Sequence, residues 1–136
     1  MDVLFIFYIE KIINNDLTGH RAAWTYTSKS NTVAGCSNGV NNRILTISNL
    51  DKNYIYIAAG WVRLQSAQGY LSTGLHNGSS TFGMECIEAQ RGDFYPVASV
   101  VAVIPNATTI GIDATQKGNN SATIDANLYI IGIRVY

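Results

Sequence analysis

The chain has 136 residues, which is enough for one domain with an ordinary hydrophobic core. Lys and Arg together number 9 and Asp and Glu together number 9, so the chain lacks the positive charge with which proteins bind nucleic acid. Charged residues make up 13% of the chain, against roughly 25% in most soluble domains, which indicates a surface that is rich in neutral polar groups or is covered by a large contact.

The first 20 residues are predicted to be an N-terminal lead-in or stalk remnant, and residues 21–136 a head domain. Residues 3–9 are as apolar as the hydrophobic part of a signal peptide, but they follow Asp2 rather than a basic segment, and no small-residue cleavage site comes after them. The pattern of residues 3–17 leaves helix and strand both open. No stretch reaches the ~20 apolar residues of a membrane helix, so we expect no membrane insertion.

The rest of the chain reads as short strands separated by turn residues. The alternation of apolar and polar residues predicts strands over 22–28, 43–48, 54–64, 70–76, 82–89, 97–104, 108–115 and 122–136. Residues 30–42 are rich in Asn, Gly and Ser and are expected to form a loop, with room for a short strand at 32–34. Asn77-Gly78 predicts a tight hairpin. About eight short strands at this spacing indicate an all-β, antiparallel sandwich or barrel.

The last strand is apolar on both of its faces. Tyr129, Ile131 and Ile133 alternate with Leu128 and Ile130, whereas a strand of an antiparallel sheet in water usually keeps one polar face. We therefore expect a second copy of the chain to cover one face.

Several segments, taken in chain order, resemble the jelly-roll heads of the tumour necrosis factor and complement globular-head superfamily. The segments that carry the resemblance are residues 50–64, 71–78, 99–104, 109–115 and 128–136. Thr-Thr-Ile-Gly-Ile at 108–112 and the final Arg-Val-Tyr most resemble receptor-binding heads of bacteriophage tail fibres and baseplates. Two positions depart from the family pattern, because Pro105-Asn106 stands where Gly-Asp is common and Ile131-Gly132 where an aromatic residue precedes the glycine.

The resemblance implies an antiparallel jelly-roll β-sandwich of about eight to ten strands that forms a homotrimer. The trimer would join through the inner sheet, around a threefold axis. The residues expected at that interface are Tyr54, Tyr56, Leu128, Ile130, Arg134 and Tyr136.

The sequence offers little for catalysis or metal binding. Residues 35–39 fit the Gly-x-Ser-x-Gly nucleophile elbow, but that motif needs a strand before it and a helix after it, in a chain with βαβ repeats. Cys36, Cys86, His20 and His76 lack the close spacing of zinc ligands. We expect no catalytic residue, no metal and no cofactor. The two cysteines are more readily explained as free buried thiols than as a disulfide, although pairing stays open.

Turn regions with aromatic and polar residues are the candidates for ligand contact, since binding residues concentrate on loops. The candidate ligand-binding residues are Tyr70, His76, Asn77, Arg91, Asp93 and Tyr95. A neutral chain rich in Asn, Ser, Thr and Tyr favours a saccharide as the ligand.

The sequence thus predicts a non-enzymatic adhesion head, located on a virion at a tail-fibre or baseplate tip, that binds a host-surface glycan or protein as a trimer. Two alternatives stay open. The first is a structural virion component, such as a fibre tip or capsid decoration protein, without its own ligand. The second is a secreted signalling ligand of the same superfamily.

Overall fold

The computed structural model describes residues 22–89 and 95–135, and within these ranges the chain forms eight β-strands. The expected domain of residues 1–20 lies outside the described residues. The strands are β1 (Ala22–Ser37), β2 (Asn41–Ile47), β3 (Ile55–Leu64), β4 (Gly69–His76), β5 (Thr81–Ala89), β6 (Val97–Pro105), β7 (Ile110–Lys117) and β8 (Ser121–Val135).

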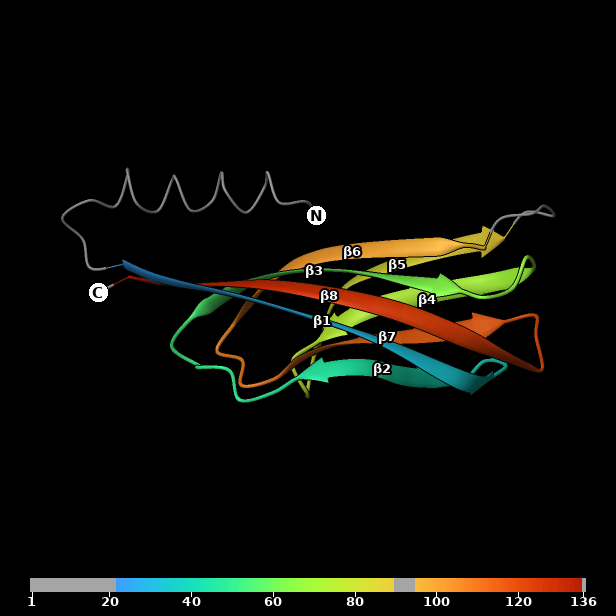
Figure 1. Cartoon of the computed structure of the whole chain (residues 1–136), viewed down its shortest axis with the longest axis horizontal. Coiled ribbons are helices and arrows are strands. Elements are labelled where there is room, and N and C mark those ends of the chain that lie inside the picture. Colours follow the sequence, from blue (N-terminus) through green and yellow to red (C-terminus); the bar gives the residue numbers. More distant parts are fainter. Residues whose placement is uncertain (1–21, 90–94, 136) are drawn as a thin grey trace.

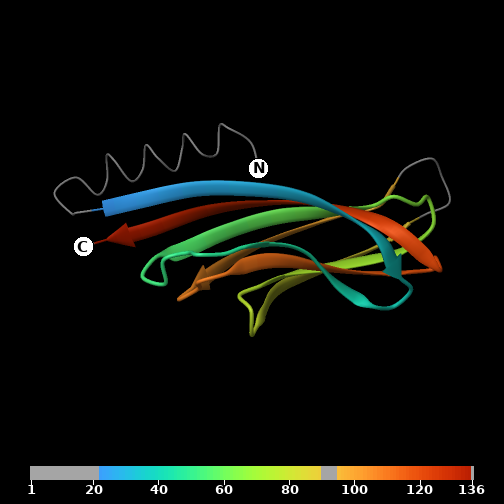
Figure 2. The same cartoon turned by 60° about the horizontal axis from the view of Figure 1, so that its bottom comes forward.

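The strands form two four-stranded antiparallel sheets that stack as two layers (Figures 1 and 2). Sheet A has the order β1-β8-β3-β6, and sheet B has the order β2-β7-β4-β5. The chain changes sheet at every connection except the β4–β5 hairpin, which is the strand order of a jelly roll. The predicted all-β, antiparallel jelly-roll sandwich is therefore confirmed, as is the hairpin at Asn77-Gly78.

The core lies between the sheets and is made of aliphatic side chains that alternate along the strands. Leu64, Leu71, Ile112, Ile124 and Leu128 are all completely buried. Each strand contributes every second residue to this layer because successive side chains of a strand point to opposite faces.

One polar side chain in this layer has its hydrogen bonds satisfied. The amide of Gln116 is fully buried, and its Nε2 donates to the carbonyl oxygens of Cys36 and Asn119, each at 2.9 Å. Its Oε1 accepts a hydrogen bond from Asn119 Nδ2 at 3.3 Å. Gln116 thus ties the end of β1 to the β7–β8 turn without leaving a buried polar group unpaired.

The first strand is longer than its composition indicates. Residues 30–37, expected to be mainly loop, continue β1 because β8 offers a long partner that pairs from Val135 to Ser121. The register shifts between Val33 and Cys36, where Gly35 has a φ of 72°. A glycine adopts this left-handed conformation without strain, so the bulge absorbs a polar, glycine-containing stretch without ending the strand.

Three of the predicted trimer-interface residues belong to the core of the single chain. Tyr56, Leu128 and Ile130 are 2%, 0% and 1% exposed and pack between the two sheets. Their placement at an interface was wrong because sheet B of the same chain already covers this face of β8. The face of β8 that looks away from the core carries Tyr129, Ile131 and Ile133 instead.

The other predicted interface residues lie near one end of sheet A. Tyr54 is half-buried, and its ring centroid lies 6.0 Å from that of Tyr56. Arg134 is also half-buried, with its Nη1 3.8 Å from Asp51 Oδ2. Tyr136 lies outside the described residues.

The core position of Leu128 is tested by Leu128→Ala. We expect the substitution to lower the free energy of unfolding by about 2–5 kcal/mol, because it removes buried methyl groups and leaves a cavity. Urea unfolding followed by circular dichroism measures the loss. Val40→Ala is the control, since Val40 is 51% exposed and its truncation should change stability by less than about 0.5 kcal/mol. A loss from Leu128→Ala that depends on protein concentration would instead place Leu128 in a contact between copies.

Candidate functional site

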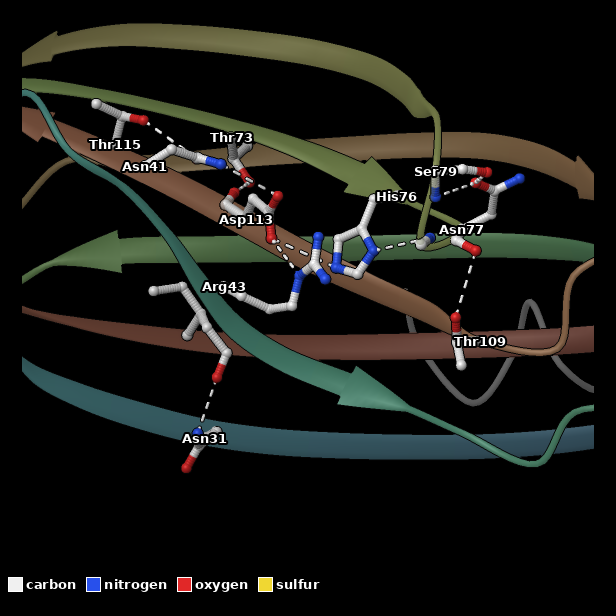
Figure 3. Close-up of polar contacts among 12 residues, drawn as sticks. Asn31, Asn41, Arg43, Thr73, His76, Asn77, Ser79, Thr109, Asp113 and Thr115 are labelled. Atoms are coloured by element: carbon white, nitrogen blue, oxygen red, sulfur yellow. Dashed lines mark hydrogen bonds and ion pairs between the residues drawn. The ribbon is translucent and has the colours of Figure 1, made fainter.

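The outer face of sheet B is polar and centres on Asp113 of β7. We name the set of Asn41, Arg43, His76 and Asp113 the Asp113 cluster. Asn41 Nδ2 donates to Asp113 Oδ2 at 3.2 Å, and Arg43 Nε lies 3.3 Å from Oδ1 (Figure 3). Thr115 Oγ1 in turn donates to Asn41 Oδ1 at 3.2 Å. Alternation places these groups together because β2, β7 and β4 are neighbours in the sheet.

His76 is the buried member of the Asp113 cluster and is 3% exposed. Its Nδ1 accepts a hydrogen bond from the Gly78 backbone N–H at 3.2 Å, so the proton of the neutral ring lies on Nε2. Nε2 lies 3.3 Å from Asp113 Oδ1 without forming a hydrogen bond to it (Figure 3). The ring lies directly over Gly111, where even a Cβ atom would collide with it. His76 is therefore a buried residue that its neighbours hold in place, and its burial does not fit the predicted role of an exposed ligand contact.

Burial sets the charge state of His76. Removal of the ring from water lowers its pKa, and the charge of Arg43 lowers it further, while the Asp113 carboxylate raises it. The balance is a pKa below the ordinary value of 6.5, so the Asp113–His76 contact joins a carboxylate to a neutral ring at neutral pH. Among the described residues no hydroxyl or thiol hydrogen-bonds to this ring, so the pair has no nucleophile to activate.

A hollow of about 230 Å³ lies beside the Asp113 cluster. Its lining residues are Asn41, Ser72, Thr73, Gly74, Thr81, Met84, Asp113 and Thr115. A Cβ atom at Gly74 would come within 2.9 Å of Thr81 Cγ2. The lack of a side chain at this position therefore leaves room for the hollow. The hollow is shallow and polar, with the oxygens of Asp113 already in contact with donors from β2.

The other predicted ligand-contact residues are divided between internal contacts and solvent. Asn77 caps the hairpin, since its Oδ1 accepts from the backbone N–H groups of Ser79 and Ser80 at 3.1 and 2.8 Å. Tyr70 is half-buried and its hydroxyl donates to Cys86 Sγ at 2.7 Å. Tyr95 is 49% exposed.

Arg91 and Asp93, also predicted to touch a ligand, lie outside the described residues. The structure therefore brings His76 and Asn77 together at one hairpin, and it leaves Tyr70 at the far end of β4.

The outer face of sheet A is apolar over most of its length. We name this surface the apolar band, and its residues are Trp24, Tyr26, Ile55, Ile57, Ala59, Val101, Val103, Tyr129, Ile131 and Ile133. Tyr26, Ile131, Ile57 and Val103 are direct cross-strand neighbours across all four strands. Exposure varies along the band, since Val101 and Val103 are 66% and 59% exposed whereas Ile131 and Ala59 are buried.

The same face becomes polar at the other end of the sheet, around Asp125. We name the set of Thr32, Arg63, Gln65 and Asp125 the Asp125 cluster. Arg63 Nη2 donates to Asp125 Oδ2 at 2.7 Å, and Gln65 Nε2 donates to the carboxylate at 2.9 Å. Thr32 Oγ1 donates to Oδ1 at 2.8 Å. Burial alone raises the pKa of Asp125, but these hydrogen bonds and the Arg63 charge outweigh burial and hold the pKa below its ordinary value.

The cysteines do not pair in the described part of the chain. Cys36 is buried in the core and Cys86 is exposed on sheet B, so only one of the two matches the expected buried thiol. Burial raises the pKa of the Cys36 thiol and keeps it protonated. The Gly35–Gly39 segment forms the end of β1 and the turn into β2, without the helix that a nucleophile elbow requires.

Within residues 22–89 and 95–135, no group of three or more His, Cys, Asp or Glu side chains is placed to hold a metal ion. The same ranges contain no helix long and apolar enough to cross a membrane.

No family model and no curated protein matches the chain. Among solved structures, it is similar to a protein of the disulfide-linked pili that form Bacillus endospore appendages, with 12% identity and a TM-score of 0.49 over 82% of this chain and 88% of that one. A capsid chain of Helicobacter pylori bacteriophage KHP30 gives 8% identity and a TM-score of 0.46 over 85% and 97% of the two chains. The globular domain of zebrafish complement 1qA gives 10% and 0.44 over 76% and 94%. The jelly-roll assignment itself rests on the strand order of this chain.

Burial of neutral His76 predicts a pH-dependent stability. Well above pH 6.5 the ring is neutral in both the folded and the unfolded state, and its full contribution to stability is present. As the pH falls below 6.5, the unfolded chain takes up a proton that the folded chain resists, so the folded state loses stability between pH 7 and pH 5. Urea unfolding at both pH values measures the loss, and His76→Asn should reduce it. Equal pH dependence in the two proteins would contradict the burial of a neutral ring.

Proposed function

We propose that the protein is a non-enzymatic, self-assembling jelly-roll head of a virion or other extracellular structure, and that copies associate through the outer face of sheet A. The apolar band is the observation that carries this proposal. Tyr26, Ile55, Val101 and Val103 are its exposed members, whereas Ile131 and Ala59 are already buried in the single chain. Exposed apolar side chains gathered on one face mark contact sites in soluble proteins. In the described part of the chain, the outer face of sheet B is polar along β2, β7 and β4.

A second copy of the same chain is the occupant that the chemistry of the band favours. The band offers aliphatic and aromatic groups and no charge, so its complement is another apolar surface. The chain has no net charge to repel its own copies, and only 13% of its residues are charged. A homotrimer is the arrangement implied by the resemblance to complement and tumour necrosis factor heads. The proposed interface consists of the apolar band, with Arg134 and Tyr54 at its end.

The more specific role that we propose is attachment, as the receptor-binding head of a phage or virion fibre that recognises a host-surface saccharide. Assembly through the apolar band leaves sheet B, its turns and the polar end of sheet A around Asp125 outside the contact, and three copies would strengthen a weak single site. Of the predicted contacts, Tyr95 is exposed in the described part of the chain.

A structural virion component without its own ligand, such as a fibre tip or capsid decoration protein, is the second candidate function. It needs only the apolar band, and it differs from the first in binding no cell or glycan. A secreted signalling ligand would share the trimer but would bind a protein receptor.

The proposed assembly predicts a mass of about three times the 14.8 kDa of one chain at micromolar concentration. Val101→Glu with Val103→Glu should reduce the mass to that of a monomer, because both side chains are exposed in the single chain and two buried carboxylates would be costly in a contact. Light scattering coupled to size-exclusion chromatography measures the mass. Val40→Glu is the matched control, since Val40 is equally apolar, 51% exposed and outside the band. A monomeric wild-type protein would overturn the proposed assembly.

The attachment role predicts binding of the assembled protein to a glycan array. The Val101→Glu/Val103→Glu protein should bind the same glycans at least about a hundredfold more weakly, because it presents one site at a time. An assembled protein that binds no glycan and no cell would favour the structural component.

A further inference from the structure

The geometry points to a binding site for a neutral saccharide on the outer face of sheet A, in the hollow beside Trp61 and next to the apolar band. This inference deepens the attachment role proposed above, but it assigns the site to residues that the turn-based prediction did not include. The hollow has a volume of about 310 Å³, and the residues that make its polar wall and floor are Ser30, Thr32, Trp61, Arg63, Asp125 and Asn127.

Strand register brings these side chains together. Trp61 of β3 pairs with Asn127 of β8, which pairs with Ser30 of β1. One step along the same face, Arg63 pairs with Asp125, which pairs with Thr32. The hollow therefore lies on three adjacent strands, and its shape is set by the sheet rather than by a loop.

Trp61 supplies the apolar surface of the site. It is half-buried in the middle of a strand, so its position is fixed while part of the ring stays open. Sugar rings carry an apolar C–H face and a rim of hydroxyl groups, and an aromatic ring with polar groups beside it matches both. Its neighbours on the polar side are Asn127 and Ser30, whose side chains make no hydrogen bond to other described residues. The Asn127 amide can both donate and accept, as sugar hydroxyls do.

The Asp125 cluster explains why the ligand should be neutral. Arg63 and Asp125 form an ion pair at 2.7 Å, so the two charges compensate and the hollow has no net charge to attract a phosphate or an acidic sugar. A nucleotide base could stack on an indole too, but nucleic acid needs a positive groove for its backbone. Arg63 Nε and Nη2 and Gln65 Nε2 are already directed at Asp125, which makes the polar wall rigid before any ligand arrives.

The test uses the monomeric Val101→Glu/Val103→Glu chain with Trp24→Phe, so that Trp61 is the one indole left. Methyl glycosides of glucose, galactose and N-acetylglucosamine, and their β-linked disaccharides, are titrated up to about 100 mM while the indole emission is recorded. We expect a saturable change for at least one sugar, with a dissociation constant on the order of 1 mM, as is usual for ligands of this size. Methyl glucuronide should bind no better than its neutral counterpart.

Asn127→Ala and Trp61→Phe should each weaken binding about tenfold or more. Because Trp61→Phe removes the indole emission, binding to this variant is measured by ligand-observed NMR. Met84→Ala is the matched control, since Met84 is exposed on sheet B, and its binding should stay unchanged. Thermal unfolding checks that each variant is folded. The site is overturned if no sugar gives a saturable change, or if Tyr95→Ala abolishes binding while Asn127→Ala does not. A wild-type chain that is monomeric and still binds sugar would contradict the proposed trimer and support this site.

Discussion

The structure depends on β8, a strand that pairs on both sides and is apolar on both faces. An alternating strand specifies its own register, because a shift by one residue would expose its apolar residues. β8 lacks this safeguard, since Leu128 and Ile130 could exchange places with Tyr129 and Ile131 at little cost in hydrophobicity. Which face meets sheet B must therefore be fixed by something other than apolar content.

Two features of β8 can fix its register. Gly132 lies under the Tyr56 ring, where a Cβ atom would come within 2.7 Å of Tyr56 Cε1, so a larger residue shifted into this position would collide. At the other end of β8, Asp125 receives hydrogen bonds from Thr32 of β1 and Arg63 of β3. These contacts exist only when all three strands are in the observed alignment. Gly132 and the Asp125 carboxylate thus specify the register of β8, which its hydrophobic pattern alone does not determine.

The sequence predicted those elements whose alternation and turns agree. β3, β4 and the Asn77-Gly78 hairpin were found close to their bounds because period-two patterns end there at clear turn residues. The continuous strand over residues 30–37 was not predicted, because these residues are held in a strand by pairing with β8 and not by their own composition.

The candidate sites were harder to predict because they depend on pairing between distant strands. His76 next to a turn suggested an exposed loop residue, yet the ring is covered once β4 lies beside Gly111 of β7. The neighbours of Trp61 come from β8 and β1, and no local motif links residues 30, 61 and 127. Knowledge of the strand order together with the register would have been enough to find them.

The position of the Trp61 hollow relative to the apolar band has a consequence for recognition. The Trp61–Asn127–Ser30 set adjoins the Ala59–Tyr129 pair that begins the band, and both surfaces belong to one sheet. If copies join through the band, the distances between their hollows are fixed by packed strands and not by flexible loops. Sites at fixed spacing gain affinity together only for ligands that repeat at that spacing. Such an assembly would therefore bind a dilute free sugar weakly and would bind tightly to a surface that presents many copies of the same sugar.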